Sequence, residues 1–209
     1  MKERPILFSG PMVEALLAGT KTKTQTRRIV AGALYGRPAV KVAPDSEIER
    51  LTSKCPYGAP GDRLWVRETL RRRGAIWTYD ADGAEVTLPQ GDPRIGAMLS
   101  WAHHKEGNTC VSIHMPRWAS RITLEIVSVR VERLQDITEE DAEAEGVDED
   151  PGEPQHEYHS TTGVYLGACY PDASYVRAFQ ALWDSINGER ASWQSNPWVW
   201  VVSFQRVQP

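Results

Sequence analysis

The feature that most constrains the fold is a long alternation of apolar and polar residues between Arg121 and Leu134. Alternation with a period of two is typical of a β-strand that buries one face. The phase of the pattern changes near Val127, so a bulge or bend is expected there. The apolar positions are Ile122, Leu124, Ile126, Val129 and Val131.

Shorter patterns on either side indicate further elements. Residues 11–19 predict a short helix, because Pro11 suits a first helical turn and Gly19 a helix end. Tight turns are expected around Pro60 and Gly61. Strands are expected over residues 62–69 and 198–207, with a hairpin turn over residues 80–83.

Two helices are expected in the C-terminal half. Thr138 has the features of an N-cap, and Gly146 would end that helix after about two turns. Asp172 is expected to cap a longer helix that ends at Asn187-Gly188. The apolar face of the longer helix comprises Tyr175, Val176, Phe179, Leu182, Trp183 and Ile186.

Several strands, three short helices and no alternation of strand and helix favour an α+β fold. The expected architecture is a small, mainly antiparallel β-barrel with peripheral short helices. The 209 residues suit a single domain. No apolar run approaches the roughly 20 residues that cross a bilayer, so no membrane association is expected. Three widely spaced cysteines and a polar N-terminus favour a reduced, cytoplasmic protein.

Charge is distributed unevenly along the chain, although the net charge is only −4. Residues 1–73 hold 15 Lys/Arg against 7 Asp/Glu, a balance of +8. Residues 132–157 hold 12 Asp/Glu against Arg133 alone, a balance of −11. The basic segment favours phosphate-containing partners, whereas the acidic segment disfavours tight nonspecific binding of long nucleic acids. A solvated surface with an acidic loop is the alternative interpretation.

A small set of polar residues suffices for hydrolysis of an amide or ester without a metal. A lysine activates a threonine hydroxyl, a carboxylate passes a proton to the leaving group, and an arginine binds a carbonyl or phosphate. Lys23, Thr26, Arg28 and Glu145 are the candidates. A regular strand would place Lys23 and Thr26 on opposite faces, so the two meet only if the strand starts after Lys23. The alternative is a solvated basic strand with Glu145 on the surface.

The motifs around these residues resemble the ASCH domain family. The resemblance rests on Gly19 followed by Lys23-Thr24-Gln25-Thr26-Arg27-Arg28, on residues 60–66 (PGDRLWV), on residues 134–146 (LQDITEEDAEAEG) and on the closing strand at residues 198–204. It implies a PUA-like β-barrel and chemistry on RNA or nucleotides. Residues 112–121 are similar to long phage and prophage members, with insertions at about residues 70–118 and 148–171.

One branch of that family is the small bacterial N4-acetylcytidine amidohydrolase. The resemblance implies that Lys23 is the general base, that Thr26 is the nucleophile and that Glu145 shuttles the proton to the departing amine. Arg28 matches the arginine that ends the motif. Three residues separate Gly19 from Lys23 where the family pattern has one, so Lys21 with Thr24 is a rival register. Only the register that starts at Lys23 also places an arginine, Arg28, at the end of the motif.

Further residues are candidates for binding substrate. Trp65 could stack on a base or pack in the core, and Glu68 could enter the pocket or form a cross-strand salt bridge. Arg67 and Lys21 complete the expected binding set. Arg117 and Arg121 could also bind phosphate, but simple placement on the surface is the favoured interpretation. No standard metal-ligand spacing is present, so neither a metal nor a cofactor is expected.

Three functions fit these residues. The first is hydrolysis of an amide on an acylated cytidine-like base, either in a free nucleoside or in RNA. The second is a non-catalytic RNA-binding or modified-base-binding module. The third is a metal-independent ribonuclease in which Lys23 and Arg28 stabilise a pentavalent phosphate. The expected ligand is therefore a nucleoside or RNA, and the sequence leaves the oligomeric state open.

Overall fold

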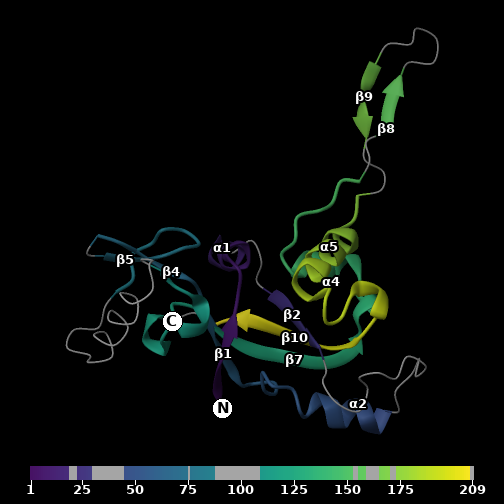
Figure 1. Cartoon of the computed structure of the whole chain (residues 1–209). Coiled ribbons are helices and arrows are strands. Elements are labelled where there is room, and N and C mark those ends of the chain that lie inside the picture. The colour runs from purple at the N-terminus through teal and green to yellow at the C-terminus, as the bar shows by residue number, and fades with distance from the viewer. Residues whose placement is uncertain are drawn as a thin grey trace. The chain divides into compact units, whose positions relative to one another are not determined.

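The computed structural model describes residues 1–18, 23–29, 45–74, 76–87, 109–152, 155–158, 165–169 and 173–207. For residues 23–29, 45–47, 155–158 and 165–169 it describes the course of the backbone only. The chain is an α+β protein whose sheets are mostly antiparallel, as the sequence indicates (Figure 1). Contacts group the chain into unit 1, residues 1–24, 49–130 and 202–209, and unit 2, residues 25–48 and 131–201.

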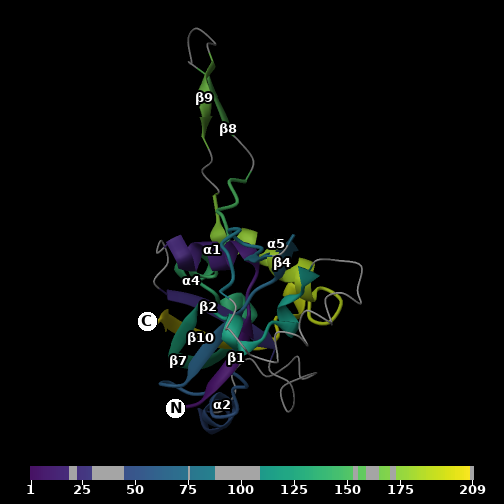
Figure 2. The ribbon, with the colours of Figure 1, turned by 90° about the vertical axis from the view of Figure 1, so that its left-hand side faces the viewer.

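A five-stranded sheet with the order β1-β3-β7-β10-β2 contains the longest strands. β7 and β10 run side by side in both views (Figures 1 and 2). Three strands, β2, β7 and β10, contribute residues to both units. Its strands are β1 (Glu3–Leu7), β2 (Lys23–Ile29), β3 (Arg63–Arg67), β7 (Thr123–Arg133) and β10 (Trp198–Arg206). These bounds confirm the expected strands at residues 62–69, 121–134 and 198–207.

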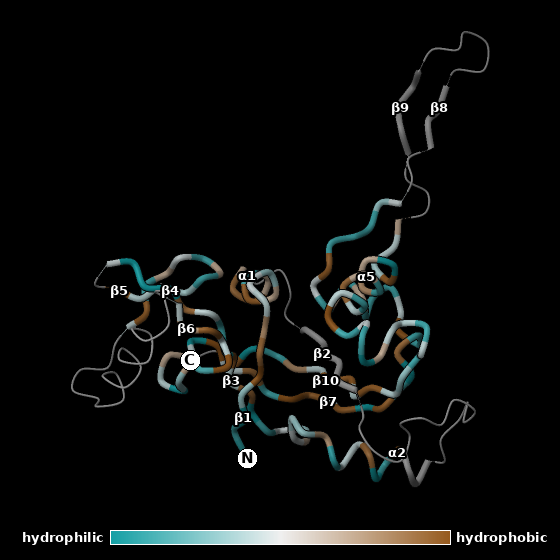
Figure 3. Tube along the Cα trace, in the orientation of Figure 1, coloured by the Kyte–Doolittle hydropathy of each residue, from teal (hydrophilic) through white to brown (hydrophobic). Residues whose placement is uncertain are grey.

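β3 is the central strand of the unit 1 part of this sheet. It pairs in parallel with β1, so that Pro5 lies opposite Trp65, and antiparallel with β7, so that Leu64 lies opposite Leu124. Leu64 and Val66 are fully buried, and apolar residues colour β3 and β7 brown in Figure 3. The described strand pairs do not close this sheet into a barrel, so the expected barrel remains a prediction.

β7 confirms the expected change of phase. Leu124 and Ile126 are buried, Val127 is 45% exposed, and the next buried position is Val131. Because buried positions move from even to odd numbers, the strand turns its other side inward after Val127.

A three-stranded sheet with the order β5-β4-β6 also belongs to unit 1. The turn at residues 80–83 follows β5 as expected: the Tyr79 carbonyl oxygen accepts a hydrogen bond from the Gly83 N–H at 2.9 Å, and Gly83 has a φ of 73°. The strands are β4 (Leu70–Arg73), β5 (Ile76–Tyr79) and β6 (Thr109–Cys110). The core of this sheet comprises Leu70, Trp77, Tyr79, Val86, Cys110, Met115 and Ala119.

Helix α1 (Gly10–Ala18) confirms the expected N-terminal helix and buries Val13 and Leu16 within unit 1. A second helix, α2 (Asp45–Thr52), was not expected from the sequence. Its Leu51 is buried. The remaining short elements are the 3₁₀-helices η1 (Ser112–His114), η2 (Arg117–Ala119), η3 (Leu134–Asp136) and η4 (Trp193–Ser195).

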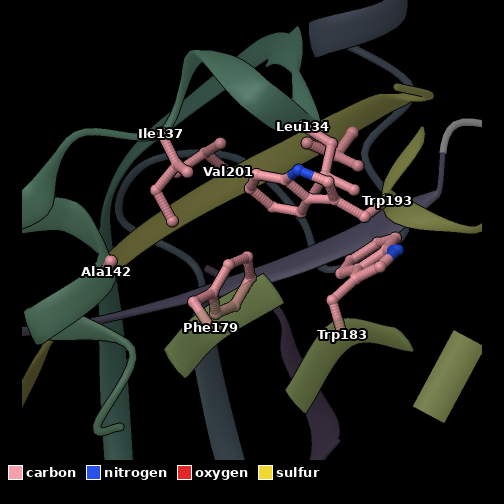
Figure 4. Close-up of a cluster of buried hydrophobic side chains, with 8 residues drawn as sticks. Leu134, Ile137, Ala142, Phe179, Trp183, Trp193 and Val201 are labelled. Carbon is pink, nitrogen blue, oxygen red and sulfur yellow. The ribbon is translucent and has the colours of Figure 1, made fainter. Parts of the chain in front are cut away.

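Helices α4 (Glu139–Ala144) and α5 (Tyr175–Asn187) pack on one another in unit 2. The core that they share with η4 and β10 is drawn in Figure 4. The Phe179 and Trp193 rings pack edge to face, with their centroids 6.3 Å apart. The Trp183 Nε1–H donates a hydrogen bond to the Ala191 carbonyl oxygen at 2.7 Å. The core residues are Leu134, Ile137, Ala142, Phe179, Trp183, Trp193, Val199 and Val201.

Two expectations for α5 were wrong. Ser174 caps the helix, accepting a hydrogen bond from the Arg177 N–H at 3.2 Å, whereas the expected cap, Asp172, lies outside the described residues. The expected apolar face is also too wide, because Leu182 is 40% and Ile186 70% exposed. The helix does end at Gly188, as expected.

The expected insertion at residues 148–171 contains a two-stranded antiparallel sheet that the sequence did not indicate. It is formed by β8 (Gln155–Tyr158) and β9 (Tyr165–Cys169). The chain on either side is joined where Asp150 and Ser174 exchange backbone hydrogen bonds of 3.2 and 2.9 Å. The assignment of the whole chain to a single domain stays a prediction.

Phe179→Ala is expected to destabilise unit 2 by about 3–5 kcal/mol, because it leaves a cavity beneath two tryptophans. Ile186→Ala on the same helix is the matched control and should change the free energy of unfolding by no more than about 0.5 kcal/mol. Denaturant unfolding followed by circular dichroism measures both. Equal losses would contradict the assignment of the buried face of α5.

Candidate functional site

The expected catalytic strand is present as β2, which begins at Lys23 and includes Thr26 and Arg28. The side chains of these three residues lie outside the described part of the structure, as does all of Lys21. The sequence required the strand to start after Lys23 if that lysine was to meet Thr26. The strand already includes Lys23, so its bounds do not meet the requirement that it start after this lysine.

Glu145 lies at the end of α4, where its placement depends on local capping. The Thr138 hydroxyl accepts a hydrogen bond from the Asp141 N–H at 3.1 Å, which confirms the expected N-cap. Gly146, with a φ of 88°, ends the helix as expected. Glu145 is the C-cap residue and donates its N–H to the carbonyl oxygens of Asp141 and Ala142.

Burial distinguishes Glu145 from its neighbours, because the residue is only 6% exposed whereas Glu143 is exposed. Removing a carboxylate from water costs free energy, so buried carboxylates are uncommon. Contacts place Glu145 in unit 2 together with the strand segment that carries Thr26 and Arg28, and place Lys23 in unit 1.

Trp65 and Arg67 are brought together on β3. The Arg67 guanidinium lies over the Trp65 ring, 4.7 Å from its centroid, and that of Arg117 lies 5.8 Å from the same ring. Trp65 is only 8% exposed, which favours its interpretation as a packed residue over a base-stacking one. Arg117 also pairs with Glu3, and hydrogen bonding to Arg117 lowers the pKa of that carboxyl.

Glu68 forms the salt bridge that the sequence offered as one of two interpretations. The Arg121 guanidinium donates to both Glu68 carboxylate oxygens, at 2.9 and 2.7 Å, and to Asp82 at 2.7 Å. It also stacks on the Tyr79 ring at 3.8 Å. Glu68 is 2% exposed and the Arg121 side chain 18%, so Arg121 is not the surface residue expected from the sequence.

Two groups of this network have shifted pKa values. Hydrogen bonding to Arg121 lowers the pKa of the Asp82 carboxyl, and burial raises the pKa of the Tyr79 hydroxyl. The Tyr79 hydroxyl donates to the Ala119 carbonyl oxygen at 2.8 Å. Sequence reasoning missed Tyr79 and Asp82 because 39 residues separate Asp82 from Arg121, and no local pattern links them.

The Pro60-Gly61-Asp62 motif has a structural role in unit 1. Asp62 accepts a hydrogen bond from the Lys2 N–H at 2.8 Å and pairs with Arg4 at 3.4 Å. Donation by Lys2 lowers the pKa of the Asp62 carboxyl. The motif therefore holds the start of β1 against the start of β3.

Within the described ranges, no group of three or more His, Cys, Asp or Glu residues is arranged to hold a metal ion. Of the residues between positions 103 and 114 whose types can bind zinc, His103 and His104 lie outside those ranges and Cys110 is fully buried. The helices that the structure describes include none with the length and apolarity to cross a membrane.

Comparison with known proteins gives no relative: no family model, no curated protein and no solved structure matches this chain. The resemblance to the ASCH family therefore rests on the motif residues themselves.

Glu68→Gln is expected to destabilise unit 1 by about 3 kcal/mol, because it leaves the mostly buried Arg121 guanidinium short of one carboxylate. Asp80→Asn breaks the exposed ion pair with Arg71 in the same unit and should leave stability nearly unchanged. Denaturant unfolding compares the two variants. A decrease no larger for Glu68→Gln than for Asp80→Asn would contradict the importance of the buried pair.

Acid should weaken the same network through Asp82. Because the folded-state pKa of Asp82 is lowered, its contribution to stability is present above the ordinary aspartate value of about 4 and is lost as the pH falls through the folded-state value. The melting temperature should fall over that range, and Asp82→Asn should make the fall shallower. Calorimetry at a series of pH values tests this, and an unchanged slope in the variant would refute it.

Proposed function

We propose that this chain is a nucleoside- or RNA-directed hydrolase that cleaves an amide on an acylated cytidine-like base. The observation that carries the proposal is the burial of Glu145 at the end of α4, a helix that contributes Ala142 to the apolar core of unit 2. A carboxylate held away from water at a cost in stability is typical of a functional site.

Two further observations support this assignment. The β2 segment with Thr26 and Arg28 belongs to the same compact unit as Glu145. The motif residues on β2, at the Pro60–Asp62 turn and on α4 resemble the ASCH pattern, although three residues separate Gly19 from Lys23 where that pattern has one. Membership of that family, a PUA-like barrel built from the five-stranded sheet and a cytoplasmic location are parts of the same proposal.

In the proposed reaction Lys23 accepts the Thr26 hydroxyl proton as the threonine oxygen attacks the acyl carbonyl carbon. The bond from the carbonyl carbon to the base nitrogen then breaks as Glu145 passes the proton held by Lys23 to the departing amine nitrogen. Water hydrolyses the resulting acyl-threonine ester, which releases the carboxylic acid and restores Thr26. Arg28 binds the carbonyl oxygen and stabilises its developing charge.

Purified protein is expected to hydrolyse N4-acetylcytidine, presented free or within a short RNA, to cytidine and acetate. Thr26→Ala and Glu145→Gln should each lower kcat/KM by about 100-fold or more, because each removes a group that acts in the transition state. Liquid chromatography of the products measures the rate. Glu143→Gln, an exposed glutamate on the same helix, is the matched control and should leave the rate unchanged.

Lysine variants test the register of the motif. Lys23→Ala should abolish hydrolysis and Lys21→Ala should not, whereas the opposite result would move the site to Lys21 and Thr24. Absence of hydrolysis with every substrate would refute the proposed hydrolase activity. Binding of RNA without turnover would then favour the binding module, and cleavage of the RNA itself would favour the ribonuclease.

A further inference from the structure

One face of β3 presents two arginines on either side of a tryptophan. Because side chains alternate along a strand, Arg63, Trp65 and Arg67 point to one side of the sheet and Leu64 and Val66 to the other. Arg63 and Arg67 are each partly exposed as whole residues, although the Nε atom of each is buried.

These two arginines differ from four other arginines of unit 1, which form ion pairs. Arg4, Arg71, Arg117 and Arg121 each pair with a carboxylate. Within the described part of the chain, neither Arg63 nor Arg67 has a carboxylate oxygen within 4.0 Å. Glu3 and Glu125 occupy the register positions beside Arg63, but the Glu3 carboxylate is bound by Arg117.

The Arg67 guanidinium is held in place without its charge being neutralised. It stacks over Trp65 at 4.7 Å and donates from Nη1 to the Ile113 carbonyl oxygen at 2.9 Å. Its Nε atom is buried with no hydrogen-bond partner among the described residues. A guanidinium has five N–H donors, so most of the donors of Arg67 are not used by the described residues.

Arg117 adds a third cation to this face, since its guanidinium lies 5.8 Å from the Trp65 ring. Its Nε and Nη2 atoms donate to the two Glu3 carboxylate oxygens at 3.1 and 3.2 Å. The Arg117 side chain is 45% and the Glu3 side chain 41% exposed, so this pair is weak and an anion in solution can displace it. Glu3 thus occupies the position that a ligand anion would take on Arg117.

We propose that this face of unit 1, formed by Arg63, Trp65, Arg67 and Arg117, binds a phosphate group of a nucleotide or of an RNA backbone. Preorganised guanidinium groups bind phosphate through paired, charge-assisted hydrogen bonds. Trp65 fixes the direction of the Arg67 fork, so little conformational entropy is lost on binding. The inference stands on unit 1 alone and does not rest on the proposed hydrolase.

Binding is measured by calorimetry and by fluorescence anisotropy with four probes: inorganic phosphate, cytidine, cytidine 5′-monophosphate and a short single-stranded RNA. Arg67→Gln should weaken binding of the phosphate-containing probes by about tenfold or more, because it removes a charge-assisted hydrogen bond. With RNA, the slope of log K against log salt should fall in magnitude by about 0.7 for each phosphate that the variant no longer neutralises.

Arg73→Gln is the matched control, because it removes the same charge from an exposed position of β4 in the same unit. It should affect binding far less than Arg67→Gln. Thermal melts confirm that each variant is folded. If Arg67→Gln does not fold, Arg63→Gln takes its place, with a weakening of the same direction expected. Equal effects of Arg67→Gln and Arg73→Gln would overturn the proposal in favour of nonspecific attraction.

Glu3→Gln provides the opposite test, because it frees Arg117 from its internal carboxylate and should strengthen binding of the phosphate probes. Glu14→Gln, which removes a charge from an exposed position of α1, should not reproduce that gain. Binding of cytidine 5′-monophosphate but not cytidine supports a nucleotide phosphate, and binding of RNA alone supports the backbone. Absence of binding to every phosphate probe overturns the inference, whatever the result of the hydrolase assay.

Discussion

Burial of β3 on both faces is the constraint on which unit 1 depends. Leu64 and Val66 are fully buried on one side and Trp65 is 8% exposed on the other, while β1 and β7 pair with its two edges. A strand fixed in this way cannot change its register without exposing apolar side chains. The packing of the strand therefore sets the side of the sheet on which its charged residues lie.

The buried ion pair of Glu68 and Arg121 follows from that constraint. Glu68 comes directly after β3, Arg121 precedes β7, and Asp82 lies in the hairpin turn beyond β5. Three segments distant in sequence thus converge on one guanidinium. The cost of removing these charges from water is offset by the bidentate geometry and by stacking on Tyr79. The network fixes the hairpin turn to the end of β3.

Unit 2 depends in a similar way on contacts between helices. α4 has only six residues and would not be stable alone, so its position depends on packing against α5. The Glu139 carboxylate accepts hydrogen bonds from the Ser174 hydroxyl and from the Tyr175 N–H, both at 2.7 Å, and so caps the start of α5. Glu145, directly after this helix, is buried, which is why the proposed site includes it.

The sequence by itself determined the elements whose signals are local. α1, the strands β3, β7 and β10, and the Thr138 cap depend on residues within a few positions of one another, and all were predicted. Tertiary structure alone decided that Ile186 is exposed, that Arg121 is mostly buried and that Glu68 pairs with it. These outcomes depend on contacts between segments up to 53 residues apart, for which a single sequence contains no periodic signal.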